Sequence, residues 1–225
     1  MYFYYSDLLI IPILLLPLIA QGLIRSSYNK HSKIKCSSNI KGRDVARMIL
    51  DKNGLNNVSI EKVGGTLSDH YNPKTKSFNL SESIYDDSSI SSLSVAAHEC
   101  GHAIQDKEKY SFFNLRSALV PVVNVTAKLS SIMILLGFVL EFAGLLSIGI
   151  LLLCAGLLFQ FVTLPVEFDA SNRARKQLQE LGLITDTELS GVKKVLNAAA
   201  MTYVAGFLAE ALQVLRLVLI TRRRN

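Results

Sequence analysis

Residues 94–104 of this chain read Ser94-Val-Ala-Ala-His98-Glu99-Cys100-Gly101-His102-Ala-Ile104. The three alanines and Glu99 in this stretch are strong helix formers. Two histidines four residues apart lie on one face of a helix, so their ring nitrogens can converge on one tetrahedral Zn²⁺. Glu99 lies beside them and can hold a proton. The pattern therefore predicts a metal centre that activates water.

The flanking residues also favour this interpretation. Acidic and hydroxyl side chains at 86–89 offer a helix start, and Leu93, Ala97, Cys100 and Ile104 form an apolar stripe beside the histidines. The alternative is a core helix whose two histidines only satisfy hydrogen bonds. Because the whole pattern sits in a helical context, we favour the metal centre.

Composition places much of the chain in a membrane. Half of its 225 residues are apolar, and the mean hydropathy is +0.32, which soluble domains seldom show. Residues 8–24 form an apolar run about long enough to cross a bilayer, and residues 118–166 form a longer one. Since one span needs about 20 residues, the longer run predicts two spans joined near Glu141.

We expect six segments along the chain. They are an N-terminal transmembrane anchor at 1–24, a cytoplasmic half with the histidine motif at 25–116, a transmembrane helical hairpin at 117–166, cytoplasmic helices at 167–196, a membrane segment at 197–220 and a basic tail at 221–225. The first segment lacks a basic start and a clear cleavage site, so it is interpreted as a retained anchor. The segment at 197–220 contains Glu210 and Arg216, and it either spans the bilayer or packs on its face.

Basic residues predict the orientation in the membrane. Four of them, from Arg25 to Lys35, follow the first apolar run, and others flank the hairpin but are absent from its tip. The positive-inside rule then puts the N-terminus outside and the motif in the cytoplasm. We therefore expect a multi-pass cell-membrane protein whose site faces the cytoplasm. The net charge of +6 also favours contact with anionic lipid headgroups.

Other classes of function have little support in the sequence. The basic tail has no interleaved aromatic residues, which argues against nucleic-acid binding. Glycine-rich phosphate loops and nucleophile elbows are not seen. The three cysteines, Cys36, Cys100 and Cys154, offer no disulfide framework, and reduced thiols suit a cytoplasmic domain.

The segment before the motif predicts one helix and a small antiparallel sheet. Residues 42–53 carry a helical pattern that ends at the stop signal Asn53-Gly54. Residues 58–60 and 67–80 predict a strand and a hairpin. The hairpin carries His70 and Tyr71, which either reach a reacting carbonyl or simply pack on the sheet. An extended peptide could pair with such a strand. His31, which lies among lysines, is expected to be a solvated loop residue.

After the membrane hairpin, the sequence predicts two more helices. The first starts near residues 164–170 and ends at Leu181-Gly182. The second opens with a capping box formed by Thr185 and Glu188. No proline stops this second helix, so it could continue into the membrane segment.

Three separated motifs carry a resemblance to a known family. They are His98-Glu-Cys-Gly-His-Ala-Ile-Gln105, Asp69-His-Tyr-Asn-Pro73 and Leu164-Pro-Val-Glu-Phe-Asp-Ala-Ser-Asn-Arg-Ala174. With the motif at 69–73 upstream of the histidines and the motif at 164–174 downstream, nearly the whole chain resembles the YugP-type neutral zinc metallopeptidases of bacterial membranes. More distantly, the chain is similar to the HtpX-type gluzincins. The resemblance implies hydrolysis of protein or peptide substrates, which could include membrane proteins, with Zn²⁺ as the cofactor.

The resemblance also implies residue roles. His98, His102 and Glu167 would bind Zn²⁺, and Glu99 would move a proton from water to the leaving amine. The candidates for stabilising the transition state or contacting the substrate are His70, Tyr71 and Tyr203. The HtpX-type relatives carry an aspartate four residues after the third ligand. Here that position is Ser171, which weakens the case for a carboxylate role there.

Helical register distinguishes Glu167 from Asp169. The two residues are two positions apart, and so roughly 160° apart around a helix. From Glu167 the same face continues through Ser171 and becomes apolar, whereas from Asp169 it continues through charged residues. The inward-facing register therefore agrees with the resemblance in selecting Glu167.

The expected fold is that of a mostly α membrane protein. An α+β zincin-like cytoplasmic metallopeptidase domain with a small antiparallel sheet would be attached to about three or four transmembrane helices. The expected function is that of a membrane-embedded zinc endopeptidase. The alternative is a non-proteolytic, zinc-containing scaffold or chaperone-like binding protein. Structural zinc usually has four protein ligands, but Cys100 points about 160° away from His98, so three ligands and an open position favour the hydrolase.

Overall fold

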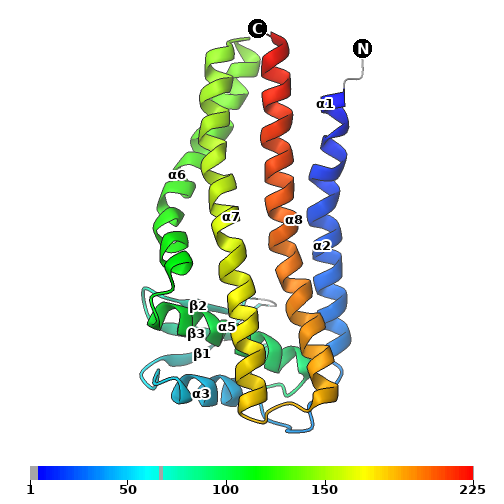
Figure 1. Cartoon of the computed structure of the whole chain (residues 1–225), viewed down its shortest axis with the longest axis vertical. Coiled ribbons are helices and arrows are strands. Elements are labelled where there is room, and N and C mark those ends of the chain that lie inside the picture. Colours follow the sequence, from blue (N-terminus) through cyan, green and yellow to red (C-terminus); the bar gives the residue numbers. More distant parts are fainter. Residues whose placement is uncertain (1–4, 66–67, 225) are drawn as a thin grey trace. The chain divides into compact units, whose positions relative to one another are not determined.

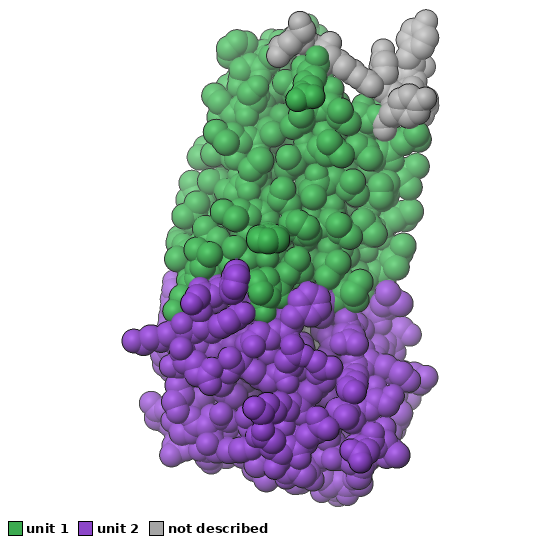
Figure 2. Space-filling view, viewed as in Figure 1, with its two compact units in different colours: residues 1–21, 114–165, 201–225 green, residues 22–113, 166–200 purple. Residues whose placement is uncertain are grey.

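The computed structural model describes residues 5–65 and 68–224 (Figure 1). Its elements are α1 (Tyr5–Leu8), α2 (Ile10–His31), α3 (Gly42–Lys52), β1 (Ser59–Val63), β2 (His70–Asn72), β3 (Ser77–Ser81), α4 (Glu82–Tyr85), α5 (Ile90–Lys107), α6 (Ser111–Val139), α7 (Ala143–Glu180) and α8 (Asp186–Arg224). They form two compact units (Figure 2). Unit 1 comprises the described parts of residues 1–21, 114–165 and 201–225, and unit 2 comprises those of 22–113 and 166–200.

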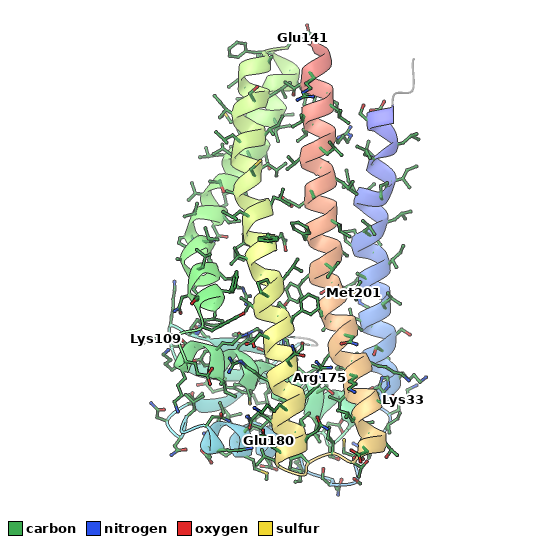
Figure 3. All side chains as sticks on the ribbon, viewed as in Figure 1. Lys33, Lys109, Glu141, Arg175, Glu180 and Met201 are labelled. Carbon is green, nitrogen blue, oxygen red and sulfur yellow. The ribbon has the colours of Figure 1, made fainter. Side chains whose placement is uncertain are left out.

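Unit 1 is built from segments of α2, α6, α7 and α8. Each of these helices is long and apolar enough to cross a membrane. Large apolar side chains are exposed along them, including Val139 at 69% and Leu151 at 72%. Exposure of this extent is unfavourable in water but suits a lipid environment. A short turn with Glu141 joins α6 to α7, where the sequence predicted the tip of the hairpin (Figure 3).

Small residues let the helices of unit 1 approach one another closely. A Cβ atom on Gly137 of α6 would lie 2.7 Å from the Leu146 side chain of α7. A Cβ atom on Gly156 of α7 would lie 2.9 Å from Glu210 Oε1 of α8. Close packing at small residues is typical of helices within membranes. The hydrophobic effect does not drive helices together in lipid, so their association depends on close van der Waals contact.

The sheet of unit 2 has three strands in the order β1-β3-β2. Strands β2 and β3 are antiparallel, which confirms the predicted hairpin. Strand β1 pairs with β3 in parallel, so the prediction of an antiparallel sheet is wrong for this strand. The reason lies in β3, whose Phe78 and Leu80 are fully buried. The apolar strand takes the centre of the sheet, and β1 and β2 take its two edges.

The core of unit 2 lies where α3 packs against α5 (Figure 1). Helix α3 buries Val45, Ile49 and Leu50. It ends at Lys52, and Gly54 then adopts a φ of 64°, as the predicted helix stop requires. Helix α5 starts after Ser89, whose side chain accepts a hydrogen bond from Ser92 N at 3.2 Å.

Helices α7 and α8 are longer than the elements that the sequence predicted. Helix α7 continues through Pro165, where we expected a membrane span to end and a second helix to begin. A proline removes one helical hydrogen bond, and long helices in membranes tolerate that loss. Helix α8 continues without a break from Asp186 to Arg224. The capping box at its start is confirmed, since Thr185 N donates to Glu188 Oε2 at 2.7 Å.

The predicted environment of His31 is wrong. His31 is the last residue of α2, not a loop residue, and only 5% of it is exposed. Its Nδ1 lies 2.8 Å from Ser27 O, one turn earlier in the helix. A Cβ atom on Gly191 of α8 would lie 3.1 Å from the His31 ring. The neighbouring lysines suggested a solvated position for His31. Charge in the sequence does not show which face of a helix is buried, so this prediction failed.

Candidate metal centre

Three polar side chains on α5 bring metal-ligand atoms together. The donor atoms of His98, Glu99 and His102 lie within 4.8 Å of one another. The two imidazole rings have centroids 4.8 Å apart and planes at 82°. This geometry follows from the helical spacing of the two histidines. Buried residues on the opposite face, such as Leu93 and Cys100, hold the helix in the core of unit 2.

Helix α7 adds a second carboxylate to this cluster. Glu167 Oε2 lies 3.2 Å from His98 Nε2 and 3.6 Å from His102 Nε2. In a tetrahedral zinc site with bonds of about 2.1 Å, neighbouring ligand atoms are about 3.4 Å apart. Only 1% of Glu167 is exposed, and a buried carboxylate needs compensating positive charge. The three side chains therefore fit a Zn²⁺ ion.

The approach of α7 to α5 depends on Gly101. A Cβ atom at this position would lie 2.6 Å from the carbonyl oxygen of Ala170 and 3.0 Å from its Cα. Both are backbone atoms, so a larger residue would push the two helices apart. Gly101 thus lets α7 bring Glu167 to the histidines. The sequence alone did not indicate this role, although the glycine lies inside the motif.

The remaining ring nitrogen of each histidine also has a partner. His98 Nδ1 lies 3.2 Å from Ser171 Oγ, and His102 Nδ1 lies 3.0 Å from Gln105 Oε1. Such contacts fix the orientation of a metal-binding imidazole. Ser171 thus contacts the metal-site histidine through a hydroxyl where the distant relatives carry an aspartate. Gln105 was missed in the sequence, although its i+3 position places it beside His102 on α5.

Glu99 has a different environment from Glu167. It is half-buried, and its Oε2 accepts a hydrogen bond from Tyr71 N at 3.1 Å. Desolvation raises the pKa of Glu99 to about 7; the charge of His98 lowers that pKa, and the charge of Glu167 raises it. A carboxyl group with a pKa near neutrality can both take and return a proton. Geometry thus favours Glu167 as a ligand and Glu99 as a base, although Glu99 also lies near the two histidines.

The register of α7 turns Asp169 away from this cluster. Its Oδ2 accepts hydrogen bonds from Gln105 Nε2 at 2.8 Å and from Arg173 Nε at 2.6 Å. We expected a solvated face at Asp169, but this carboxylate is bound to a fully buried glutamine. The sequence pattern could not reveal this, because Gln105 belongs to another helix.

The three candidate transition-state residues are placed in different surroundings. Tyr71 is buried, and its hydroxyl donates to Asp106 Oδ2 at 2.7 Å. His70 is exposed, and its Nε2 lies 3.2 Å from Asn79 Nδ2. The contacts of Tyr71 and His70 are typical of side chains that pack on the sheet. Such packing was the alternative to a role at the reacting carbonyl. Tyr203 lies on α8 in unit 1. Roles for these three residues stay predictions.

Comparisons with known proteins agree with this chemistry. A family model described as "Putative neutral zinc metallopeptidase" matches residues 6–222. The chain belongs to this family. It is also 45% identical over 201 residues to "Putative membrane protease YugP" of Bacillus subtilis (strain 168), which covers 89% of each chain. No solved structure matches the chain.

Membership of this zinc metallopeptidase family confirms the resemblance inferred from the three motifs. Zn²⁺ is accordingly the cofactor, and the cluster on α5 offers ligand atoms for it. A peptidase acts on peptide substrates. The four long apolar helices and the membrane protease among the relatives agree in associating the chain with a membrane.

Proposed function

We propose that this protein is a multi-pass zinc endopeptidase that hydrolyses peptide bonds near the cytoplasmic face of the membrane. The observation that carries the proposal is the convergence of His98 Nε2 and His102 Nε2 on Glu167 Oε2, at 3.2 and 3.6 Å. These three side chains would hold the ion in a gluzincin-type arrangement. The distribution of basic residues supports the cytoplasmic orientation.

The residues around this cluster have separable roles in the proposed reaction. Zn²⁺, when bound, supplies Lewis-acid chemistry that lowers the pKa of water to about 7. Glu99 takes the proton from the attacking water and returns it to the leaving amine. Tyr71 N orients the Glu99 carboxylate through its hydrogen bond. Ser171 and Gln105 hold the rings of His98 and His102 in place.

The six-segment organisation of the chain belongs to the same proposal. Residues 1–24 would form an anchor, 117–166 a transmembrane hairpin and 197–220 a fourth span, with 25–116 and 167–196 in the cytoplasm and 221–225 as a basic tail. The length and composition of α2, α6, α7 and α8 support four spans. A non-proteolytic scaffold is the less favoured alternative, because three ligands beside a proton-exchanging glutamate suit catalysis.

The proposal is tested by Glu99→Gln, which removes the base but keeps the shape of the side chain. We expect peptide hydrolysis to fall by about 100-fold or more, because general acid-base catalysis contributes roughly that much. N-terminal proteomics of membranes containing the wild-type protein or the variant would measure this. New protein termini should appear only with the wild type, and their sequences would give the cleavage preference.

Metal analysis of the same variants tests the assignment of the two glutamates. Glu99→Gln should retain zinc, while Glu167→Gln and His98→Ala should lose most of it. A Glu99→Gln protein that loses zinc as completely as His98→Ala would make Glu99 a ligand and contradict the proposed mechanism.

A further inference from the structure

We infer that Gln105, Asp169 and Arg173 form a hydrogen-bonded relay that positions His102 for metal binding. The inference rests on the proposed role of His102 as a ligand. It assigns a positioning function to three residues beyond the ligands and the base. The relay runs from a buried amide on α5 to an ion pair at the surface of unit 2.

The inner end of the relay fixes which nitrogen of His102 carries a proton. Gln105 is fully buried, and its Nε2 donates to Val166 O and to Asp169 Oδ2, both at 2.8 Å. An amide NH₂ group has two hydrogens, so these two acceptors determine its orientation. Gln105 Oε1, at 3.0 Å from His102 Nδ1, must then accept a hydrogen bond. His102 therefore carries its proton on Nδ1 and leaves Nε2 to face Glu167.

The outer end of the relay holds the Asp169 carboxylate in place. Arg173 Nε donates to Asp169 Oδ2 at 2.6 Å, and Arg173 Nη1 donates to Glu108 Oε2 at 2.7 Å. The Glu108 side chain is 54% exposed, so the chain of contacts reaches solvent. Asp169 and Arg173 also line a groove of about 460 Å³. Because Arg173 fixes the Asp169 carboxylate, the hydrogen bond from Gln105 to Asp169 keeps the Gln105 amide from rotating.

Gln105 also couples the two helices that supply the ligands. It lies on α5, three residues after His102, and it donates to the carbonyl of Val166, the residue before Glu167 on α7. One amide thus orients the ring of one ligand and contacts the backbone beside another. Loss of this amide should disturb both ligands at once.

The experiment measures metal affinity in the full-length protein, purified in detergent. Gln105→Met keeps the length of the side chain but removes its acceptor and both donors. We expect the Kd for Zn²⁺, measured by competition with a chelator, to rise by about 10- to 100-fold, which is the usual effect of losing such a partner. The visible absorption spectrum of the Co²⁺-substituted protein should also change, because the ligand geometry relaxes. Gln177→Met is the matched control, since the Gln177 side chain contacts Asn53 and lies outside the relay.

A second pair of variants tests the direction of the hydrogen bonds. Gln105→Glu should weaken zinc binding, because two carboxylates would face each other where Gln105 now donates to Asp169. Adding Asp169→Asn supplies a donor to the new carboxylate, so the double variant should recover at least part of the lost affinity. Normal zinc affinity in Gln105→Met, or a double variant no better than Gln105→Glu, would overturn the relay.

The same measurements separate the relay from the proposed function. A wild-type protein that binds zinc but produces no new termini would contradict the peptidase, while the affinity series would still support the relay. Wild-type peptidase activity with unchanged zinc affinity in all Gln105 variants would support the peptidase and overturn the relay.

Discussion

Gly101 sets the distance between the helices that carry the proposed ligands, because a Cβ atom there would meet the Ala170 backbone at 2.6 Å. We expect Gly101→Ala to lower the free energy of unfolding by about 1–3 kcal/mol, the usual cost of overpacking. Zinc affinity should fall as well, since Glu167 would move away from the histidines. Thermal unfolding and zinc titration in detergent would measure both effects.

The matched control for this change is Gly22→Ala on α2. No heavy atom lies within 4 Å of a Cβ atom built there, apart from the neighbours in its own helix. This substitution should leave zinc binding unchanged, and its effect on stability should stay within about 1 kcal/mol. Equal effects of the two substitutions on zinc affinity would contradict the role given to Gly101.

At the scale of single residues, the sequence was informative where spacing along one helix decides the geometry. His98, Glu99 and His102 belong to one helix, and the register of α7 distinguishes Glu167 from Asp169. The contacts of Ser171 and Gln105 with the histidines could not be predicted in the same way. They depend on how two helices meet, and neither residue type is a typical metal-site residue by itself.

At the level of elements, the segment that precedes α5 is tied to the segment that follows α2. The Asp87 carboxylate binds Lys35 Nζ and accepts a hydrogen bond from Ser89 N at 3.3 Å. Burial alone raises the pKa of Asp87, but the hydrogen bonds from Lys35 and Ser89 outweigh it and keep the pKa below its ordinary value. The folded state therefore favours the charged carboxylate. The resulting stabilisation is present above the unfolded pKa of about 4 and is lost as the pH falls through the lower folded pKa.

Asp87→Asn tests this contribution of the charged carboxylate. We expect it to lower stability at pH 7 by roughly 0.5–1 kcal/mol, because the ion pair with Lys35 is partly exposed. The difference from the wild type should start to shrink as the pH falls below about 4, and it should vanish below the lower folded-state pKa, where the wild-type carboxylate is also neutral. A difference that is the same at both pH values would mean that the charge of Asp87 does not stabilise the fold.

The predictions for helices and strands differed in success for a physical reason. Helix starts and stops depend on local residues such as Ser89, Gly54 and the pair Thr185 and Glu188, so they could be found in the sequence. The pairing of β1 with β3 depends on which strand occupies the centre of the sheet, which is a long-range choice. The continuation of α7 through Pro165 was also missed, because a membrane environment changes the effect of a proline.

For the molecule as a whole, the proposed topology makes opposite predictions for two exposed positions. Lys74 lies in the turn between β2 and β3 of unit 2. Glu141 lies in the turn between α6 and α7 of unit 1 (Figure 3). In intact cells, an impermeant thiol reagent should label Glu141→Cys but not Lys74→Cys. After the cells are opened, both should react. Labelling of Lys74→Cys in unbroken cells would reverse the orientation.

The native cysteines provide the background for this measurement. Cys36 and Cys100 are buried, and Cys154 is half-buried, so the wild-type chain should react slowly. Its labelling, measured in parallel, gives the baseline for both variants.

Unit 2 is assembled from two separate parts of the chain, residues 22–113 and 166–200, and this division affects how the protein is made. Under the proposed ligand set, His98 and His102 belong to the first part and Glu167 to the second. A ribosome adds about 5–20 residues per second, so several seconds pass between the synthesis of His102 and that of Glu167. During that time the nascent chain carries two ligands without the third. Under that proposal, we expect the nascent chain to stay inactive until the part of α7 that carries Glu167 has been translated.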